Sequence, residues 1–270
     1  MIRVEGLVHV YAGGTRAVDG IDLEIRAGER VAIVGQNGSG KSTLVRHFNG
    51  LLRPTEGRVL IDGQDARGKR VAALAAIVGL AFQDPDRQIF AGKVRDEVAF
   101  GPRNLGRRGD ELERTVTAAL EATGLLEEAA TNPYDLGYSR RKLLALASIL
   151  AMGTPAVVLD EPTTGQDARG VARVRAVVDA LAAEGRTIIA ITHDMRFAAE
   201  SFERVIVMRS GKVALDGPPA AAFAEDAWPT LASTYLEAPL AARVGARLGL
   251  GATPTEASLV AALAGGDGAR

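Results

Sequence analysis

One short stretch limits what this chain can fold into more than any other feature of the sequence. It reads Gly-Gln-Asn-Gly-Ser-Gly-Lys-Ser from Gly35 to Ser42, directly after the apolar run 31–34 and before a helical stretch, and it matches the P-loop pattern. In such a loop, glycines let backbone N–H groups curl around phosphate oxygens, and the start of the next helix adds partial positive charge. In a random chain of this length and composition, the pattern would be expected by chance roughly 0.006 times. We therefore predict that the chain binds a nucleotide.

The residues of this loop have separate predicted tasks. Lys41 is expected to reach the β- and γ-phosphates, and Ser42 to ligate Mg²⁺. A lysine is informative here because only 5 of the 32 basic residues are lysines, and a slender ammonium fits a tight loop where a planar guanidinium does not. A glycine-rich turn without a ligand is the alternative. The residues predicted to bind the nucleotide are Gly35, Gln36, Asn37, Gly38, Ser39, Gly40, Lys41, Ser42 and Thr43.

Two adjacent acids form the second candidate site. Asp160 and Glu161 follow the apolar run 156–159, which places them at the carboxyl edge of a parallel sheet, where such folds bind ligands. Neighbouring strand residues point to opposite sides, so the two acids have separate predicted tasks. We expect Asp160 to hold Mg²⁺ through water and Glu161 to orient or deprotonate the attacking water. Without the P-loop, a helix-capping acid beside a solvated glutamate would explain the same pattern.

Apolar runs alternate with helical stretches, which favours an α/β fold with a largely parallel sheet. Residues from about 85 to 153 contain helical stretches and no convincing strand, so we predict an inserted helical subdomain there. Residues 226–270 are predicted to form a small helical appendage, with Thr253 and Glu256 as a capping box and residues from Gly265 onward frayed. Strands are expected at 21–25, 30–34, 58–61, 77–82, 156–159, 187–192 and 205–208, and helices at 41–51, 110–123, 141–151 and 168–184.

Composition and charge exclude several classes of function. The chain has no cysteine, so disulfides, thiol nucleophiles and cysteine-ligated metal sites are excluded. The net charge of −1 makes a broad nucleic-acid-binding surface unexpected, and we predict no nucleic-acid partner. The longest uncharged run, 143–159, is interrupted by Gly153-Thr154-Pro155, which favours a helix, a turn and a strand over a membrane span. We expect a soluble cytoplasmic protein whose link to a membrane comes through a partner.

At these two motifs the sequence resembles the ABC ATPases, the nucleotide-binding subunits of ABC transporters. The interval between Lys41 and Asp160 is longer than a compact P-loop fold needs, and the helical stretch fills it. The resemblance covers essentially the whole chain. It implies a P-loop NTPase domain over residues 1–225, with a RecA-like core, an N-terminal antiparallel β part and the inserted helical subdomain. It also implies ATP and Mg²⁺ as cofactors.

Single residues match other motifs of the family, with roles that the resemblance implies. Tyr11 resembles the aromatic residue that stacks on adenine, although a core or surface tyrosine would look the same. Gln83 resembles the Q-loop glutamine, which touches Mg²⁺ and water and senses the membrane partner. His193 resembles the switch histidine that contacts the γ-phosphate, with a structural histidine as the alternative. Gly165 and Asp167 match the D-loop, which lies across the dimer interface.

The chain departs from the family pattern in the signature loop. In the family, Leu-Ser-Gly-Gly-Gln precedes a helix and closes on the γ-phosphate of the partner's nucleotide. Neither the second-position serine nor the paired glycines are present here, and cations from Arg140 to Lys142 begin the next helix against its dipole. Two interpretations remain: a basic turn near a docking polyanion, or a solvated basic turn on a degenerate site. The matching residues are Leu136, Gly137, Tyr138, Ser139 and Arg140.

The stretch from Gln83 to Gly106 resembles the ATPases of energy-coupling factor (ECF) transporters, which take up vitamins or transition-metal ions. The resemblance implies an ATP-hydrolysing subunit, peripheral on the cytoplasmic face of the cell membrane. The implied partners are a second ABC ATPase, a transmembrane coupling protein, and a small membrane protein that captures the substrate. Because the altered signature loop serves the partner's nucleotide, we expect the second ATPase to be a different chain and the two sites to be unequal. A second copy of this chain is the alternative. The alternative is the ATPase of another ABC transporter class or a regulatory subunit that hydrolyses weakly.

Overall fold

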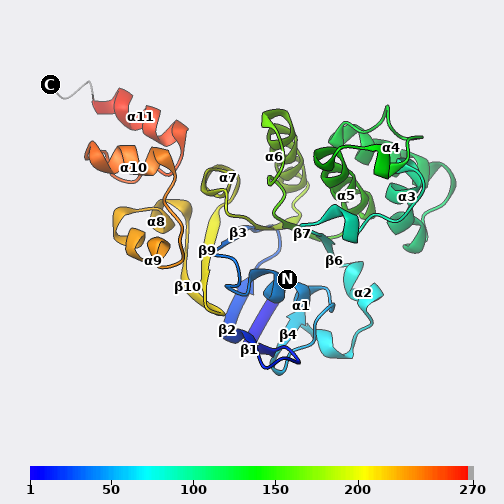
Figure 1. Ribbon diagram of the computed structural model, residues 1–270, viewed down its shortest axis with the longest axis horizontal. Helices are drawn as coiled ribbons and strands as arrows, with labels where there is room; N and C mark the ends of the chain where they lie inside the picture. Colours follow the sequence, from blue (N-terminus) through cyan, green and yellow to red (C-terminus); the bar gives the residue numbers. More distant parts are fainter. Residues whose placement is uncertain (267–270) are drawn as a thin grey trace.

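Two β-sheets and the helices around them make up the computed structural model, which describes residues 1–266 (Figure 1). The smaller sheet is antiparallel, with strand order β2-β1-β4-β5. The larger sheet has the order β10-β9-β3-β8-β7-β6, and all its strands are parallel except β10. The predicted α/β class, with a largely parallel sheet and an antiparallel N-terminal part, is confirmed. The strands are Ile2–Val10 (β1), Arg16–Ile25 (β2), Arg30–Val34 (β3), Glu56–Ile61 (β4), Gln64–Asp65 (β5), Val78–Ala81 (β6), Ala156–Asp160 (β7), Thr187–Ile191 (β8), Arg204–Arg209 (β9) and Lys212–Gly217 (β10).

The central strand β3 is buried on both faces, which explains its unbroken apolar sequence. Val31 and Ile33 belong to the hydrophobic core formed with the small sheet and helix α1 (Lys41–Phe48). Ala32 and Val34 face the other core, on the opposite face of the sheet. The strand therefore holds the P-loop, which begins at Gly35, between two packed layers.

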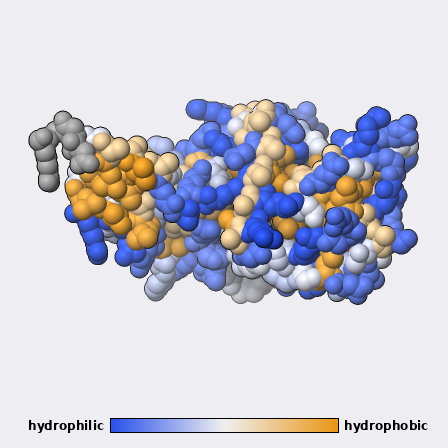
Figure 2. Space-filling view, turned by 90° about the horizontal axis from the view of Figure 1, so that it is seen from above, coloured by the Kyte–Doolittle hydropathy of each residue, from blue (hydrophilic) through white to orange (hydrophobic). Residues whose placement is uncertain are grey.

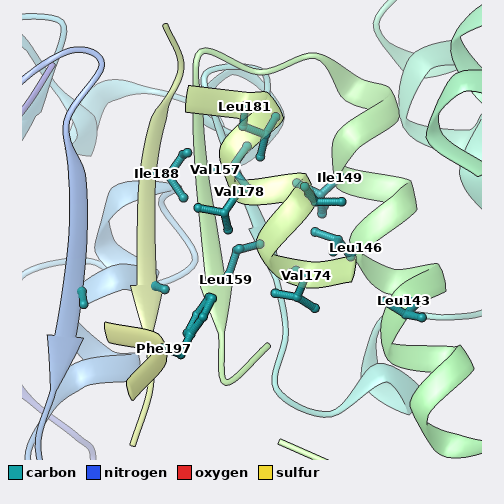
Figure 3. Packing of buried hydrophobic residues seen from close by; sticks show 14 of the residues in the cluster. Leu143, Leu146, Ile149, Val157, Leu159, Val174, Val178, Leu181, Ile188 and Phe197 are labelled. Carbon is teal, nitrogen blue, oxygen red and sulfur yellow. The ribbon is translucent and has the colours of Figure 1, made fainter. Parts of the chain in front are cut away.

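The larger core lies between the parallel sheet and helices α5 (Tyr138–Met152) and α6 (Ala168–Ala183). Figure 3 shows Leu146 and Ile149 of α5 pointing toward α6, which carries Val174, with Val157 and Leu159 of β7 to the side. Truncating such a buried leucine or isoleucine to alanine typically costs about 2–5 kcal/mol of stability. This packing fixes β7, and with it the two acids at its end.

Helices fill the segment between β6 and β7, and the structure shows no strand between residues 85 and 152. Helix α5 runs from this helical part onto the sheet, so one rigid element joins the two. The segment contains a 3₁₀ turn at Pro85–Arg87 (η2), α3 (Val94–Asn104), α4 (Gly109–Thr123), a 3₁₀ turn at Pro133–Asp135 (η3) and α5. The remaining elements before the C-terminal part are a 3₁₀ turn at Ala66–Gly68 (η1), α2 (Val71–Ala75) and α7 (Met195–Ser201).

Short helices follow β10 at the end of the molecule opposite the helical subdomain (Figure 1). Phe223 and Leu231 are buried in the main core, so residues on both sides of the predicted boundary at residue 225 pack into the same core. The division into two domains at this residue stays a prediction. Residues 267–270 of the predicted appendage lie outside the described residues. The elements are α8 (Pro219–Ala222), a 3₁₀ turn at Glu225–Ala227 (η4), α9 (Trp228–Ala232), α10 (Leu240–Arg247) and α11 (Glu256–Gly266).

The capping box predicted at the start of α11 is wrong. Thr255 caps this helix, because its hydroxyl accepts the backbone N–H of Ser258 at 3.1 Å while the Ser258 hydroxyl accepts the N–H of Thr255 at 3.0 Å. Thr253 is buried instead, and its hydroxyl donates to the carbonyl of Ala241 at 2.9 Å. Packing against α10 therefore decides which threonine caps the helix.

Apolar side chains gather on the surface of the C-terminal helices (Figure 2). Leu240, Leu248, Val260 and Leu263 are all exposed there. Over the residues that the structure describes, we find no helix that combines the length and the apolar character needed to cross a membrane.

Candidate nucleotide-binding site

Residues from several distant segments line one cavity of about 380 Å³ at the carboxyl ends of β3, β7 and β8. The cavity brings together most residues of the P-loop with Tyr11, Gln83, Asp160 and Glu161. Gly35 and Gln36 do not line it, and neither do the predicted signature-loop and D-loop residues. The lining residues are Tyr11, Thr15, Arg16, Ala17, residues 37–43, Gln83, Asp160, Glu161 and Ile191.

Close approach of backbone segments explains two glycines of the P-loop. Gly35 has φ of 148°, and a Cβ there would collide with the carbonyl oxygen of Met208 in β9. Gly40 has φ of 102°, and its Cβ would collide with the carbonyl oxygen of Ala17 in β2. Only glycine fits both the left-handed backbone and these contacts. The loop is therefore held tightly between two strands.

Lys41 begins α1 and is folded against its own loop. Its Nζ donates to the carbonyl oxygens of Gly35 at 2.6 Å and of Gln36 at 2.9 Å. Burial lowers the pKa of this ammonium, whereas the negative charges of Glu161 and Asp160 raise it. These contacts hold a positive charge at the wall of the cavity, where a phosphate would require it.

Asp160 and Ser42 form the part of the cavity that suits Mg²⁺. Burial raises the pKa of Asp160, and a hydrogen bond from Ser42 opposes that shift. Within the described residues, the buried Oδ1 of Asp160 has no hydrogen-bond partner. A carboxylate and a hydroxyl oxygen are ligands that Mg²⁺ accepts, together with water and substrate phosphates. The residues present therefore fit the ion.

Glu161 lies just past the end of β7, in an uncommon backbone conformation. Its φ of 53° is left-handed, so its carboxylate turns back to the same cavity that Asp160 lines. The expectation that strand alternation separates the two acids is therefore wrong, because β7 ends at Asp160. A non-glycine residue in this region costs about 1–3 kcal/mol and persists only when its surroundings hold it.

Contacts to neighbouring strands and loops hold Glu161 in place. Its backbone N–H donates to the carbonyl of Ile191 at 2.9 Å. Its Oε2 lies 2.8 Å from Nδ1 of His193, which follows β8, and accepts a hydrogen bond from the hydroxyl of Thr164 at 3.2 Å. His193 itself is exposed. The carboxylate is buried but oriented by an imidazole that reaches solvent, an arrangement that suits a general base and its partner.

Tyr11 and Gln83 stand on other walls of the cavity. Tyr11 follows β1, and its hydroxyl lies 3.0 Å from that of Thr43 in α1, within hydrogen-bond distance. Its ring meets the ring of His9 edge to face, with centroids 4.6 Å apart. Gln83 is exposed after β6. The structure places both at the cavity, while their roles toward adenine and Mg²⁺ stay predictions.

The signature-loop residues pack on the D-loop of the same chain. Gly137 precedes α5, and Tyr138 and Ser139 form its first turn. The Ser139 hydroxyl donates to Oε1 of Gln166 at 2.6 Å, and the Tyr138 ring lies where a Cβ on Gly165 would be. Leu136 is buried beneath the turn, and Asp167 caps α6 by accepting the N–H of Gly170 at 2.7 Å.

The three cations at the start of α5 are all engaged within the chain. Arg140 forms an ion pair with Glu128, and Arg141 forms one with Asp86 at 2.9 Å. The buried Nζ of Lys142 donates to the carbonyl of Glu161 and, at 2.9 Å, to that of Thr164. The interpretation of a solvated basic turn is therefore wrong, because acids pair with the two arginines and backbone carbonyls accept hydrogen bonds from the lysine.

Sequence reasoning missed several residues that shape this site. Residues 15–17 line the cavity from the loop before β2 and the start of that strand, without a motif of their own. Burial lowers the pKa of Lys142 to about 8, although Glu161 and Asp160 raise it. A signal for Lys142 was present, because it is one of few lysines in an arginine-rich chain.

Comparisons with known proteins agree with the geometry. The family model described as ABC transporter matches residues 18–164. A putative ABC transporter ATP-binding protein of Caldanaerobacter subterraneus is 44% identical over 226 residues, covering 84% of this chain. An energy-coupling factor transporter ATP-binding protein of Methanothermobacter thermautotrophicus is 40% identical over 225 residues, covering 83% of this chain and 72% of the relative. The chain spans only 40% of the length of the Caldanaerobacter relative.

A solved structure resembles nearly the whole chain. It is cbiO1 from Clostridium perfringens, described as part of the ABC transporter complex cbiONQ. The two structures superpose with a TM-score of 0.76 and 36% identity, over 92% of this chain and 95% of the other. The likeness extends past the ABC transporter match and includes much of the C-terminal part.

Proposed function

The chain belongs to the ABC transporter family of ATP-binding proteins, and from that premise we propose that it is the ATP-hydrolysing subunit of an ECF-type importer. The observation that carries the proposal is the placement of Asp160 and Glu161 beside the P-loop in one cavity. The relative from Methanothermobacter and the likeness to cbiO1 support the ECF type.

The residues of the cavity divide the work of phosphoryl transfer to water. Lys41 and the backbone N–H groups of the P-loop hold the phosphates. Glu161 accepts a hydrogen bond from the attacking water and takes its proton, while His193 keeps the carboxylate oriented. Ser42 and, through water, Asp160 would hold Mg²⁺, which would offset the negative charge of the phosphates. Tyr11 stacks on the adenine.

Replacing Glu161 with Gln tests this assignment. The amide keeps the size of the side chain but takes no proton, so hydrolysis in the assembled complex should fall at least about 100-fold while ATP still binds. Glu184→Gln, at an exposed glutamate after α6, is the matched control. Turnover that survives Glu161→Gln would remove Glu161 from the role of base.

Hydrolysis in this proposal requires a second ATPase subunit with a different signature loop. In this chain the Ser139 hydroxyl is bonded to Gln166 and Arg140 is paired with Glu128, so the loop offers little to a partner's γ-phosphate. We expect a heterodimer in which the partner's intact loop completes this chain's site and the other site is slow. The purified chain alone should then hydrolyse ATP poorly, and brisk turnover by it would contradict the asymmetry.

An exposed aromatic pair near Gln83 is the proposed docking surface for the transmembrane partner. Phe90 is 59% exposed and Phe100 is 48% exposed, and their rings meet edge to face at 4.7 Å. Gln88 connects this surface to the site, because its side chain accepts the N–H of Phe82 at 3.0 Å and donates to the carbonyl of Ala145 in α5 at 2.8 Å. In this proposal, a displacement of the aromatic pair would therefore be transmitted through Gln88 to Phe82, the neighbour of Gln83, and to α5, which follows the signature loop.

Serine substitutions at the aromatic pair test the docking surface. Phe90→Ser and Phe100→Ser should prevent co-purification with the membrane protein while leaving ATP affinity unchanged. Leu126→Ser, at another exposed apolar residue of the helical subdomain, is the control. Full co-purification of the double variant would place the partner elsewhere on the surface. In this proposal a separate small membrane protein captures the substrate, a vitamin or a transition-metal ion.

A further inference from the structure

A residue of the C-terminal segment forms a hydrogen bond with a part of the P-loop that does not line the cavity. Thr234, which follows α9, is fully buried. Its hydroxyl oxygen accepts the backbone N–H of Gln36 at 2.8 Å and donates to the carbonyl of Met208 at 3.4 Å. The hydroxyl therefore accepts one hydrogen bond and donates another, and in this way it links the P-loop to the end of β9.

The P-loop and the end of β9 are closely packed around this hydroxyl. Gly35 approaches the same Met208 carbonyl so closely that a Cβ would collide with it. Gln36 is held at both ends, because Thr234 accepts its N–H while its carbonyl accepts the Nζ of Lys41 at 2.9 Å. A shift of Gln36 would therefore move an acceptor of the lysine that is expected to bind phosphate.

The turn that carries Thr234 is itself fixed. Leu231 is buried in the main core, and its carbonyl accepts the N–H of Leu236 at 3.0 Å. Tyr235 between them takes a left-handed φ of 56°, which reverses the chain. The hydroxyl of Ser233 accepts a hydrogen bond from the Arg209 guanidinium at 2.8 Å. Thr234 is thus a fixed support, because the main core and β9 hold its turn in place.

We propose that Thr234 is a positioning residue of the nucleotide site and that it couples the C-terminal helices to nucleotide affinity. It keeps Gln36, and through it the Lys41 acceptors, in the conformation that binds phosphate. Without the hydroxyl, the N–H of Gln36 loses its acceptor and the carbonyl of Met208 loses one donor, so the loop shifts to find another acceptor for Gln36. The proposal rests on the proposed function only for the identity of the ligand.

Coupling of this kind is reciprocal. If the fixed turn favours nucleotide binding, then bound nucleotide must stabilise the turn by the same free energy. The backbone N–H of Leu236 reports on the turn because it closes the bond to Leu231. Its hydrogen exchange in the full chain should therefore slow when MgATP is added.

The affinity of the full-length chain for ATP, measured by titration calorimetry with Mg²⁺, tests the proposal. Thr234→Val keeps the shape but removes the hydroxyl, and we expect Kd to rise about 5- to 20-fold. Thr234→Ser restores the hydroxyl and should return Kd to within about 2-fold of wild type. Thr230→Val, the same exchange earlier in α9, should leave Kd unchanged.

The outcomes separate this proposal from the proposed function. A wild-type chain that binds no ATP would contradict the proposed function itself. A Thr234→Val variant that melts earlier but binds ATP as tightly as wild type would show a purely structural role and overturn the inference. If Thr234→Val does not fold, the exchange of Leu236 in the wild-type chain decides, and exchange that is unaffected by MgATP overturns it.

Discussion

Replacing Lys142 with Met separates the stability of this protein from its catalysis. The Nζ of Lys142 is buried and donates to the carbonyls of Glu161 and Thr164. These two bonds span the segment in which Glu161 holds its left-handed φ of 53°. Methionine has a similar length and flexibility but cannot donate a hydrogen bond, so the variant removes both bonds with little change in side-chain volume.

Two opposing free energies partly cancel in this variant. Burial lowers the pKa of Lys142 from 10.5 to about 8, which corresponds to a cost of about 3 kcal/mol for keeping the charge there at neutral pH. Lys142→Met removes that cost but takes a charged donor from the carbonyls of Glu161 and Thr164, at about 1–3 kcal/mol each. The free energy of unfolding should therefore lie between about 1 kcal/mol above and about 3 kcal/mol below that of wild type.

Catalysis has no such compensation. A displacement of about 1 Å at a reacting group costs on the order of 100-fold in rate. In the variant, Glu161 loses the hydrogen bond from Lys142 to its carbonyl, which is one of the contacts that hold its backbone. We expect kcat of the assembled complex to fall about 10- to 100-fold while the Kd for ATP changes little. Single-turnover hydrolysis, equilibrium denaturation and calorimetry measure the three quantities, with Lys69→Met at an exposed lysine as the control.

The pH dependence of stability gives an independent check on Lys142. Between pH 8 and 10.5 the unfolded chain binds more protons at this lysine than the folded chain does, so its contribution to stability rises with pH across that window. Wild type should gain stability relative to Lys142→Met as the pH rises through it. A variant with wild-type kcat, or a stability difference that does not change with pH, would refute the reasoning.

Two further predictions concern a buried histidine and a strained turn. Burial lowers the pKa of His47 below 6.5. As the pH falls, the unfolded chain therefore takes up the proton first, and the free energy of unfolding should decrease below about pH 6.5. Denaturation at pH 7.5 and pH 5.5 should show a smaller decrease for His47→Gln than for wild type. Tyr235 has a left-handed φ of 56° and is 86% exposed, so Tyr235→Gly should raise the free energy of unfolding by about 1 kcal/mol, and a stability loss would mean that the ring makes a contact that matters.

Local sequence patterns predicted the parts of the site that lie within one turn or one strand end. The P-loop between β3 and α1, and the acids after an apolar strand, depend on neighbours a few residues away. The unbroken apolar run of β3 likewise indicates a strand that is buried on both faces, as its place between two cores confirms. These features could be predicted because glycine placement and apolar runs determine them directly.

Other parts depend on contacts between residues far apart in the chain, which no local pattern reveals. Lys142 reaches the carbonyl of Glu161, and Thr234 reaches Gln36 from the far end of the chain. Local patterns left open whether the basic turn is solvated, because Glu128 and Asp86, which pair with its two arginines, lie elsewhere in the sequence. The left-handed φ of Glu161 was also hidden, because glutamate rarely adopts it and the surrounding contacts impose it.

The central claim is that this chain hydrolyses ATP as one subunit of a membrane-embedded importer. Native mass spectrometry of the tagged protein, extracted from its host's membranes in mild detergent, tests that claim most directly. The account predicts a complex that contains this chain, a second and different ATPase, one multi-span protein and one small membrane protein. Recovery of the chain without any membrane protein, under conditions that preserve other transporters, would contradict it.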